Sequence, residues 1–171
     1  TIRSTMESGA DFSDSLHGGA LAGVSYQFSD RLTLGPGIGV FTEIEDDPNI
    51  FPILLVQWKI TESLQLETGR GFGASQGPGL NLVWKASDDW KISLGSRYEN
   101  FRFRLDEDGT APNGVGEEKG VPIYLGATYA PTRASELSVY AGVKVGGSLT
   151  LEDSSGRKIS KNDYDAAPFV G

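Results

Sequence analysis

One set of charged residues recurs at alternate positions of the predicted strands, interleaved with Gly, Ser and Thr. The set consists of Arg31, Lys59, Glu67, Lys85, Lys91, Arg97, Glu99 and Lys144. If this face lines an enclosed interior, opposite charges have to pair, because an unpaired charge outside bulk water is costly. Two interpretations stay open: a closed interior packed with stabilising ion pairs, or a net-basic channel lining that favours anionic solutes.

The single histidine, His17, is the most conventional general base in the chain. It stands beside two glycines and close to Asp14 and Ser15, so a hydrolytic site at the outer end of a strand is conceivable. Such a site needs hydrogen-bond contact between its members, which spacing does not demonstrate. The plainer interpretation is a histidine at a rim, and we expect no enzymatic activity.

Composition excludes several other kinds of site. The chain has no cysteine, which removes thiolate metal sites and thiol catalysis. The segment Asp106-Glu107-Asp108-Gly109 resembles the start of a calcium loop but lacks the remaining ligands at the required spacing. The net charge of -8 argues against a nucleic-acid partner, since phosphate binding needs a basic surface. We therefore expect no metal, no cofactor and no nucleic acid.

The elements that would carry these residues are long strands. Arg31–Glu45 and Glu136–Leu151 alternate strictly between apolar residues and small or charged residues. A period of two is typical of strands, and these exceed the common length of about five or six residues. No segment has a helical period, and no run approaches the length of a membrane-spanning helix.

The connections between strands alternate in length. Short polar connections are expected at Ser29-Asp30, Thr61–Ser63, Ser87–Asp89 and Pro131–Ser135. Longer or glycine-rich ones are expected at Glu45–Asn49, Ala74–Gly79, Asp106–Lys119 and Glu152–Asp163. Tight turns at one end and long loops at the other are typical of transmembrane barrels. The sequence predicts an all-β, up-and-down antiparallel transmembrane β-barrel of about ten strands (8–12) in one domain over residues 1–171.

Large aromatic residues gather next to the short turns and share the phase of the aliphatic residues. They are Tyr26, Phe28, Trp58, Trp84, Trp90 and Tyr129. Trp and Tyr concentrate at membrane–water interfaces, where the ring is apolar and the N–H or O–H reaches water. The pattern predicts an aromatic girdle on a lipid-facing surface. The alternative is a sandwich core, in which the same rings would pack against a second sheet.

The alternating glycine-rich strands, the aromatic flanks and turns such as Phe28-Ser29-Asp30-Arg31-Leu32 resemble small to mid-sized bacterial outer-membrane β-barrels of the porin-like superfamily. The resemblance implies the bacterial outer membrane as location and outer-membrane lipid and lipopolysaccharide as partners, with other envelope proteins bound through the outer loops. Such barrels usually end in a strand that closes on a terminal aromatic residue. This chain ends at Phe169-Val170-Gly171, so we expect part of the closing strand to be missing.

The expected function is a structural or partner-binding barrel with a charge-packed lumen. The alternatives are a small-solute channel that favours anions and, third, a barrel hydrolase that uses His17. A soluble ligand-binding barrel would need an apolar interior, and the charged phase argues against it.

Overall fold

The computed structural model describes residues 2–4, 16–44, 46–68, 78–132 and 134–171, and every regular element in these ranges is a strand. The strands are β1 Ile2–Ser4, β2 Leu16–Gly23, β3 Tyr26–Ser29, β4 Leu32–Glu43, β5 Asp46–Lys59, β6 Leu64–Thr68, β7 Gly79–Lys85, β8 Trp90–Arg97, β9 Glu99–Arg104, β10 Val115–Thr132, β11 Ser135–Glu152, β12 Lys158–Tyr164 and β13 Ala167–Val170. Within the same ranges, no helix has the length and hydropathy needed to cross a membrane.

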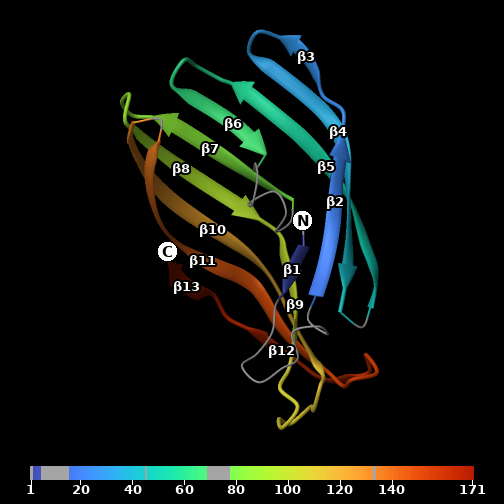
Figure 1. The fold of residues 1–171 in the computed structure, drawn as a ribbon. Helices are drawn as coiled ribbons and strands as arrows, with labels where there is room; N and C mark the ends of the chain where they lie inside the picture. Colours follow the sequence, from blue (N-terminus) through green and yellow to red (C-terminus); the bar gives the residue numbers. More distant parts are fainter. Residues whose placement is uncertain (1, 5–15, 45, 69–77, 133) are drawn as a thin grey trace.

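All strands belong to one antiparallel sheet (Figure 1). Its order is β1-β2-β4-β5-β6-β7-β8-β10-β11-β12, with β3 on β4, β9 on β10 and β13 on β11. β2 and β3 therefore act as one interrupted strand along the sheet, as do β8 and β9, and β12 and β13. Each strand or interrupted strand pairs with the one before it and the one after it in sequence, which confirms the predicted all-β antiparallel sheet.

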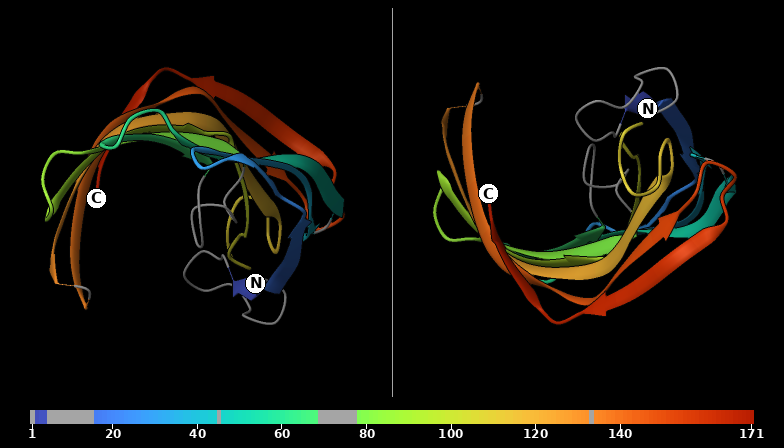
Figure 2. Two further views of the ribbon diagram at one scale, coloured as in Figure 1. Left: turned by 90° about the horizontal axis from the view of Figure 1, so that it is seen from above. Right: turned by 90° about the horizontal axis from the view of Figure 1, so that it is seen from below.

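The sheet curls into an open C and does not close into a barrel (Figure 2). The prediction of a closed barrel is therefore wrong for the described residues. Closure requires the two end strands to exchange hydrogen bonds. Here β1 contributes three residues, all paired with β2, and β12 and β13 pair with β11 alone. The predicted loop Glu45–Asn49 is also wrong, because β5 begins at Asp46 and pairs back to Glu43.

Strand register divides the sheet into two chemically different faces. Directly opposed residues form a row across successive strands: Leu32, Trp58, Leu66, Leu82, Leu94, Leu125, Ala141 and Val170. The adjacent row, on the other face, is Thr33, Gln57, Glu67, Asn81, Gly95, Tyr124, Gly142 and Phe169. We call these the apolar face and the polar face.

The polar face is the concave one. The Tyr124 hydroxyl donates a hydrogen bond to Asn81 Oδ1 at 2.6 Å, although β8 lies between their strands. Adjacent strands are about 4.8 Å apart, so side chains two strands apart meet readily only where the sheet bends toward them. Gly95 lies beneath this contact, where a Cβ atom would be 2.1 Å from the Asn81 oxygen. A larger residue at position 95 would have to displace the Tyr124–Asn81 hydrogen bond.

The apolar face is convex and open to the surroundings. Leu94 is 52% exposed and Leu125 is 58% exposed. The six predicted girdle residues (Tyr26, Phe28, Trp58, Trp84, Trp90 and Tyr129) are all exposed as well. Trp90 and Tyr129 contact each other beside the turns, with ring centroids 4.9 Å apart and the rings tilted by 31°. Because the described sheet is a single layer, these rings do not form the sandwich core considered as an alternative.

Candidate functional site

A network of ionised groups brings three of the predicted lumen residues together. Glu99, only 4% exposed, accepts hydrogen bonds from Arg97 Nε at 2.6 Å and from Lys144 Nζ at 3.0 Å. Lys144 Nζ also lies 3.1 Å from Glu118 Oε1, and the Tyr164 hydroxyl donates to the same oxygen at 2.7 Å. Two cations and two carboxylates therefore compensate each other; we call this set the Lys144 network.

Three strands position the Lys144 network. Arg97 ends β8, Glu99 begins β9, and Lys144 reaches them from β11. Lys144 crosses β10 at Gly120, where a Cβ atom would come within 2.8 Å of the lysine side chain. The network lies beside a cavity of about 400 Å³, which Tyr140 and Phe169 also line.

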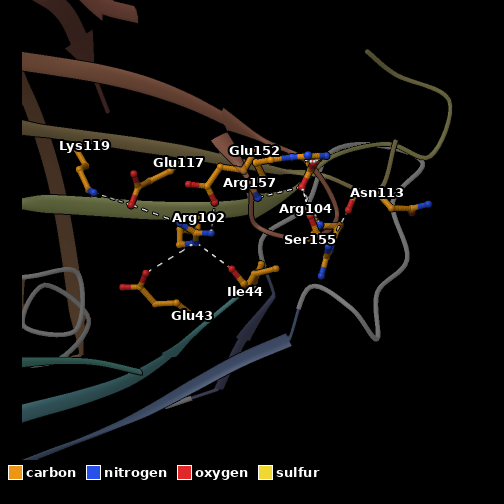
Figure 3. Close-up of polar contacts among 11 residues, drawn as sticks. Glu43, Ile44, Arg102, Arg104, Asn113, Glu117, Lys119, Glu152, Ser155 and Arg157 are labelled. Carbon is orange, nitrogen blue, oxygen red and sulfur yellow. Dashed lines mark hydrogen bonds and ion pairs between the residues drawn. The ribbon is translucent and has the colours of Figure 1, made fainter. Parts of the chain in front are cut away.

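A second network surrounds Arg102, whose side chain is 4% exposed (Figure 3). Its Nη2 bonds to Glu152 Oε2 at 2.5 Å, and its Nε donates to the Ile44 carbonyl at 3.0 Å. Glu117 lies 3.6 Å and Glu43 3.9 Å from the guanidinium nitrogens. Arg102 thus joins β9, β10 and β11 to the turn between β4 and β5, which is not adjacent to them in the sheet.

Among the described residues, Arg31, Lys59, Lys85 and Lys91 lie at or next to the short turns, outside both networks. Arg31 pairs with Glu62 at 3.4 Å and Lys85 with Asp88 at 2.8 Å, in both cases with exposed side chains at the short turns. Glu67 accepts a hydrogen bond from Gln65 at 3.2 Å. Lys91 is directly opposite Lys85, and Lys59 is opposite Gln65. The eight residues predicted to form one lining therefore separate into members of the buried Lys144 network and charged residues mostly near the short turns.

Two features of the interior were missed from the sequence. The first is Arg102, which had no assigned role. The second is an apolar patch on the polar face, formed by Phe51, Ile53 and Leu55 opposite Gly39, Gly37 and Gly35. The available signal was the run Ile50–Val56, which is apolar in both strand phases. A strand apolar on both faces has apolar surroundings on both sides.

The structure shows no hydrogen-bond geometry that would support the hydrolase hypothesis among the residues that it describes. His17 lies in β2 with Arg3 as its ladder partner, whereas Asp14 and Ser15 lie outside the described residues. Among the residues that the structure describes, no cluster of three or more His, Cys, Asp or Glu side chains could hold a metal ion.

Asp153, in the loop between β11 and β12, has a pKa that its hydrogen bonds shift. Hydrogen bonds from the Ser155 hydroxyl and the Arg157 backbone N–H hold the pKa of Asp153 well below its ordinary value. A lowered pKa stabilises the loop above the unfolded value of about 3.9, and this stabilisation is lost as pH falls further. Ser155→Ala is expected to raise the Asp153 midpoint, measured by carboxyl carbon NMR; an unchanged midpoint would contradict the assigned cause.

No protein-family model, curated protein or solved structure matches the chain. The resemblance to porin-like barrels therefore stays a prediction from the sequence pattern.

Proposed function

We propose that the chain forms the wall of an integral β-barrel in a bacterial outer membrane, with a structural or partner-binding role and no catalytic activity. The observation that supports this most directly is the polarity of the curled sheet. Apolar residues cover the convex face, and the buried Glu99, with its partners Arg97 and Lys144, lies on the opposite face. A curled sheet in water would instead turn its apolar residues toward the concave face and its charged residues toward the convex face.

The extent of the exposed apolar surface strengthens this proposal. Large hydrophobic residues exposed on the convex face occur on most strands from β3 to β13, including Leu54, Leu80, Leu94, Leu125, Leu137 and Val139. Soluble monomers rarely expose a contiguous apolar patch beyond a few hundred square ångströms. Transfer of each such side chain from water to hydrocarbon contributes about 1.5–3 kcal/mol when burial is complete.

A membrane location has a consequence for the two free edges. Open sheet edges do not occur in hydrocarbon, because each unpaired backbone group there costs several kcal/mol. In the membrane we therefore expect β1–β3 on one side and β12–β13 on the other to be paired. The proposal requires closure at these edges, which the described sheet leaves open.

The Lys144 network favours a structural interior over an anion-selective one. Its cations, Arg97 and Lys144, are compensated by Glu99 and Glu118. The outer ends of β9–β12 would then present loops to partners, here lipopolysaccharide and other envelope proteins. The loop at Asp106–Asp108 belongs to this surface and is partly or fully exposed.

A channel is the second candidate, and the charges near the turns favour it. Lys59 and Lys91 are exposed and form no ion pair within the described part of the chain. In a closed barrel, these two lysines would give the pore opening at the short-turn end a positive charge. We expect planar bilayers containing the protein to stay electrically silent. Steady anion-selective steps, lost in Arg97→Glu or Lys144→Glu, would instead establish the channel.

The membrane proposal is tested by the depth of the tryptophans. In vesicles, Trp58, Trp84 and Trp90 should all be quenched more strongly by lipids brominated near the headgroup than by lipids brominated near the chain end. All three lie beside short turns at one end of the strands, and interfacial aromatics are expected at one depth. Equal insensitivity to both lipids would show that the convex face does not contact a bilayer.

A further inference from the structure

The cavity beside the Lys144 network has a volume of about 400 Å³, and every residue that lines it belongs to the described ranges. Its wall combines two kinds of side chain: the ionised groups of the network and the aromatic rings of Tyr140, Tyr164 and Phe169. The volume falls within the usual range of about 300–1,000 Å³ for small-molecule sites. The cavity is therefore large enough for a small ligand.

Aromatic rings form one side of this cavity. The ring centroid of Tyr140 lies 6.2 Å from that of Phe169 and 6.3 Å from that of Tyr124. The three residues come from β13, β11 and β10 and share the polar, concave face. Tyr140 is 48% exposed, so part of its ring is accessible to a ligand. The face of an aromatic ring carries the negative part of its quadrupole and attracts polarised C–H groups.

Polar atoms of the Lys144 network are available to the same ligand. Arg97 bonds to Glu99 through Nε, and its Nη1 and Nη2 atoms form no hydrogen bond or ion pair with other described residues. Glu118 uses Oε1 for both Lys144 and Tyr164, whereas its Oε2 has no such partner in the described ranges. The cavity thus offers hydrogen-bond donors as well as an acceptor.

The charges around the cavity disfavour an ion as the ligand. Arg97 and Lys144 are compensated by Glu99 and Glu118. A charged ligand would lose its hydration without meeting a net opposite charge, which is costly. A hydroxyl group both donates and accepts hydrogen bonds, so it suits the donors and the acceptor alike. A pyranose ring carries hydroxyl groups at its rim and C–H groups on its faces, which matches polar atoms beside an aromatic ring.

We propose that this cavity binds a neutral sugar, with one face of a pyranose ring against Tyr140 and hydroxyl groups bonded to Arg97 and Glu118. The site lies on the concave face, so it does not depend on contact between the convex face and lipid. It adds a ligand to an interior to which the proposed function assigns a structural role.

The test uses the full chain folded in dimyristoyl phosphatidylcholine vesicles, which contain neither sugar nor aromatic protons. The probe is methyl β-cellobioside, a glucose disaccharide whose ring substituents are all equatorial. Saturation-transfer difference NMR with irradiation of the aromatic protons should give signal on the disaccharide, strongest for the C–H protons of one ring face. Tyr140→Ala should raise the dissociation constant about tenfold, the order of one lost ring contact. Tyr140→Phe should retain most of the affinity, and Tyr26→Ala, on the convex face, all of it.

Other results would overturn the proposal. No saturation transfer, or undiminished affinity of Tyr140→Ala folded as judged by gel mobility, would show that no sugar binds at this ring. Tighter binding of glucuronate or phenylalanine than of the cellobioside would replace the neutral sugar by an anion or a zwitterion.

A second variant tests the charge argument while the ring stays in place. Glu118→Gln leaves the cavity with a net positive charge, so the affinity for glucuronate relative to the cellobioside should rise about tenfold. An unchanged ratio would contradict the assignment of a neutral ligand. The tryptophan-quenching experiment is independent of all these results, so it tests the membrane location separately.

Discussion

Replacing Arg102 with methionine is expected to lower the free energy of unfolding by about 3–5 kcal/mol, the usual cost of removing one partner of a buried ionic group. The substitution removes the bonds to Glu152 and the Ile44 carbonyl. It leaves Glu43, Glu117 and Glu152 without the guanidinium that faces all three, although Lys119 still bonds to Glu117 at 2.7 Å. Reversible urea unfolding in vesicles, followed by tryptophan fluorescence, measures the change.

Three further variants show whether the loss comes from the buried charge. Arg157→Met removes an exposed arginine paired with Asp153, and it should change stability far less than Arg102→Met does. Arg102→Lys keeps the charge but not the planar set of donors, so an intermediate loss is expected. Adding Glu152→Gln to Arg102→Met should recover part of the loss, because one uncompensated carboxylate disappears. Equal effects of Arg102→Met and Arg157→Met would contradict a structural role for this network.

Alternation in the sequence was enough to predict the sheet, its antiparallel order and the division of residues between faces. Alternate residues of a strand point to the same face, so assigning one residue to a face assigns the other residues of that strand as well. Leu94 and Leu125 therefore fell on one face and Arg97 and Lys144 on the other before register was known. Pairing in register across successive strands then follows from the short turns.

Closure and the details of the interior could not be predicted in this way. Whether β1 meets β12 depends on total curvature and on edges far apart in sequence, which no strand determines by itself. The contact of Arg102 with Ile44 joins residues 58 positions apart. Strand phase also did not distinguish Lys144, inside a network, from Lys91 near a turn, because depth along the strand decides which acids come within reach.

The second large effect is expected from a charge placed at the centre of the apolar face. Leu125→Arg should destabilise the protein in vesicles by about 2–4 kcal/mol, whereas Leu137→Arg, close to a short turn, should cost about 1 kcal/mol or less, since the cost of arginine facing lipid falls toward the interface. Both leucines are exposed, at 58% and 66%, and lie on the same face. In water, two such surface substitutions would each change stability by about 0.5 kcal/mol or less. Urea unfolding of both variants measures the difference. Equal, small effects would show that the convex face contacts water, and the membrane location would then be untenable.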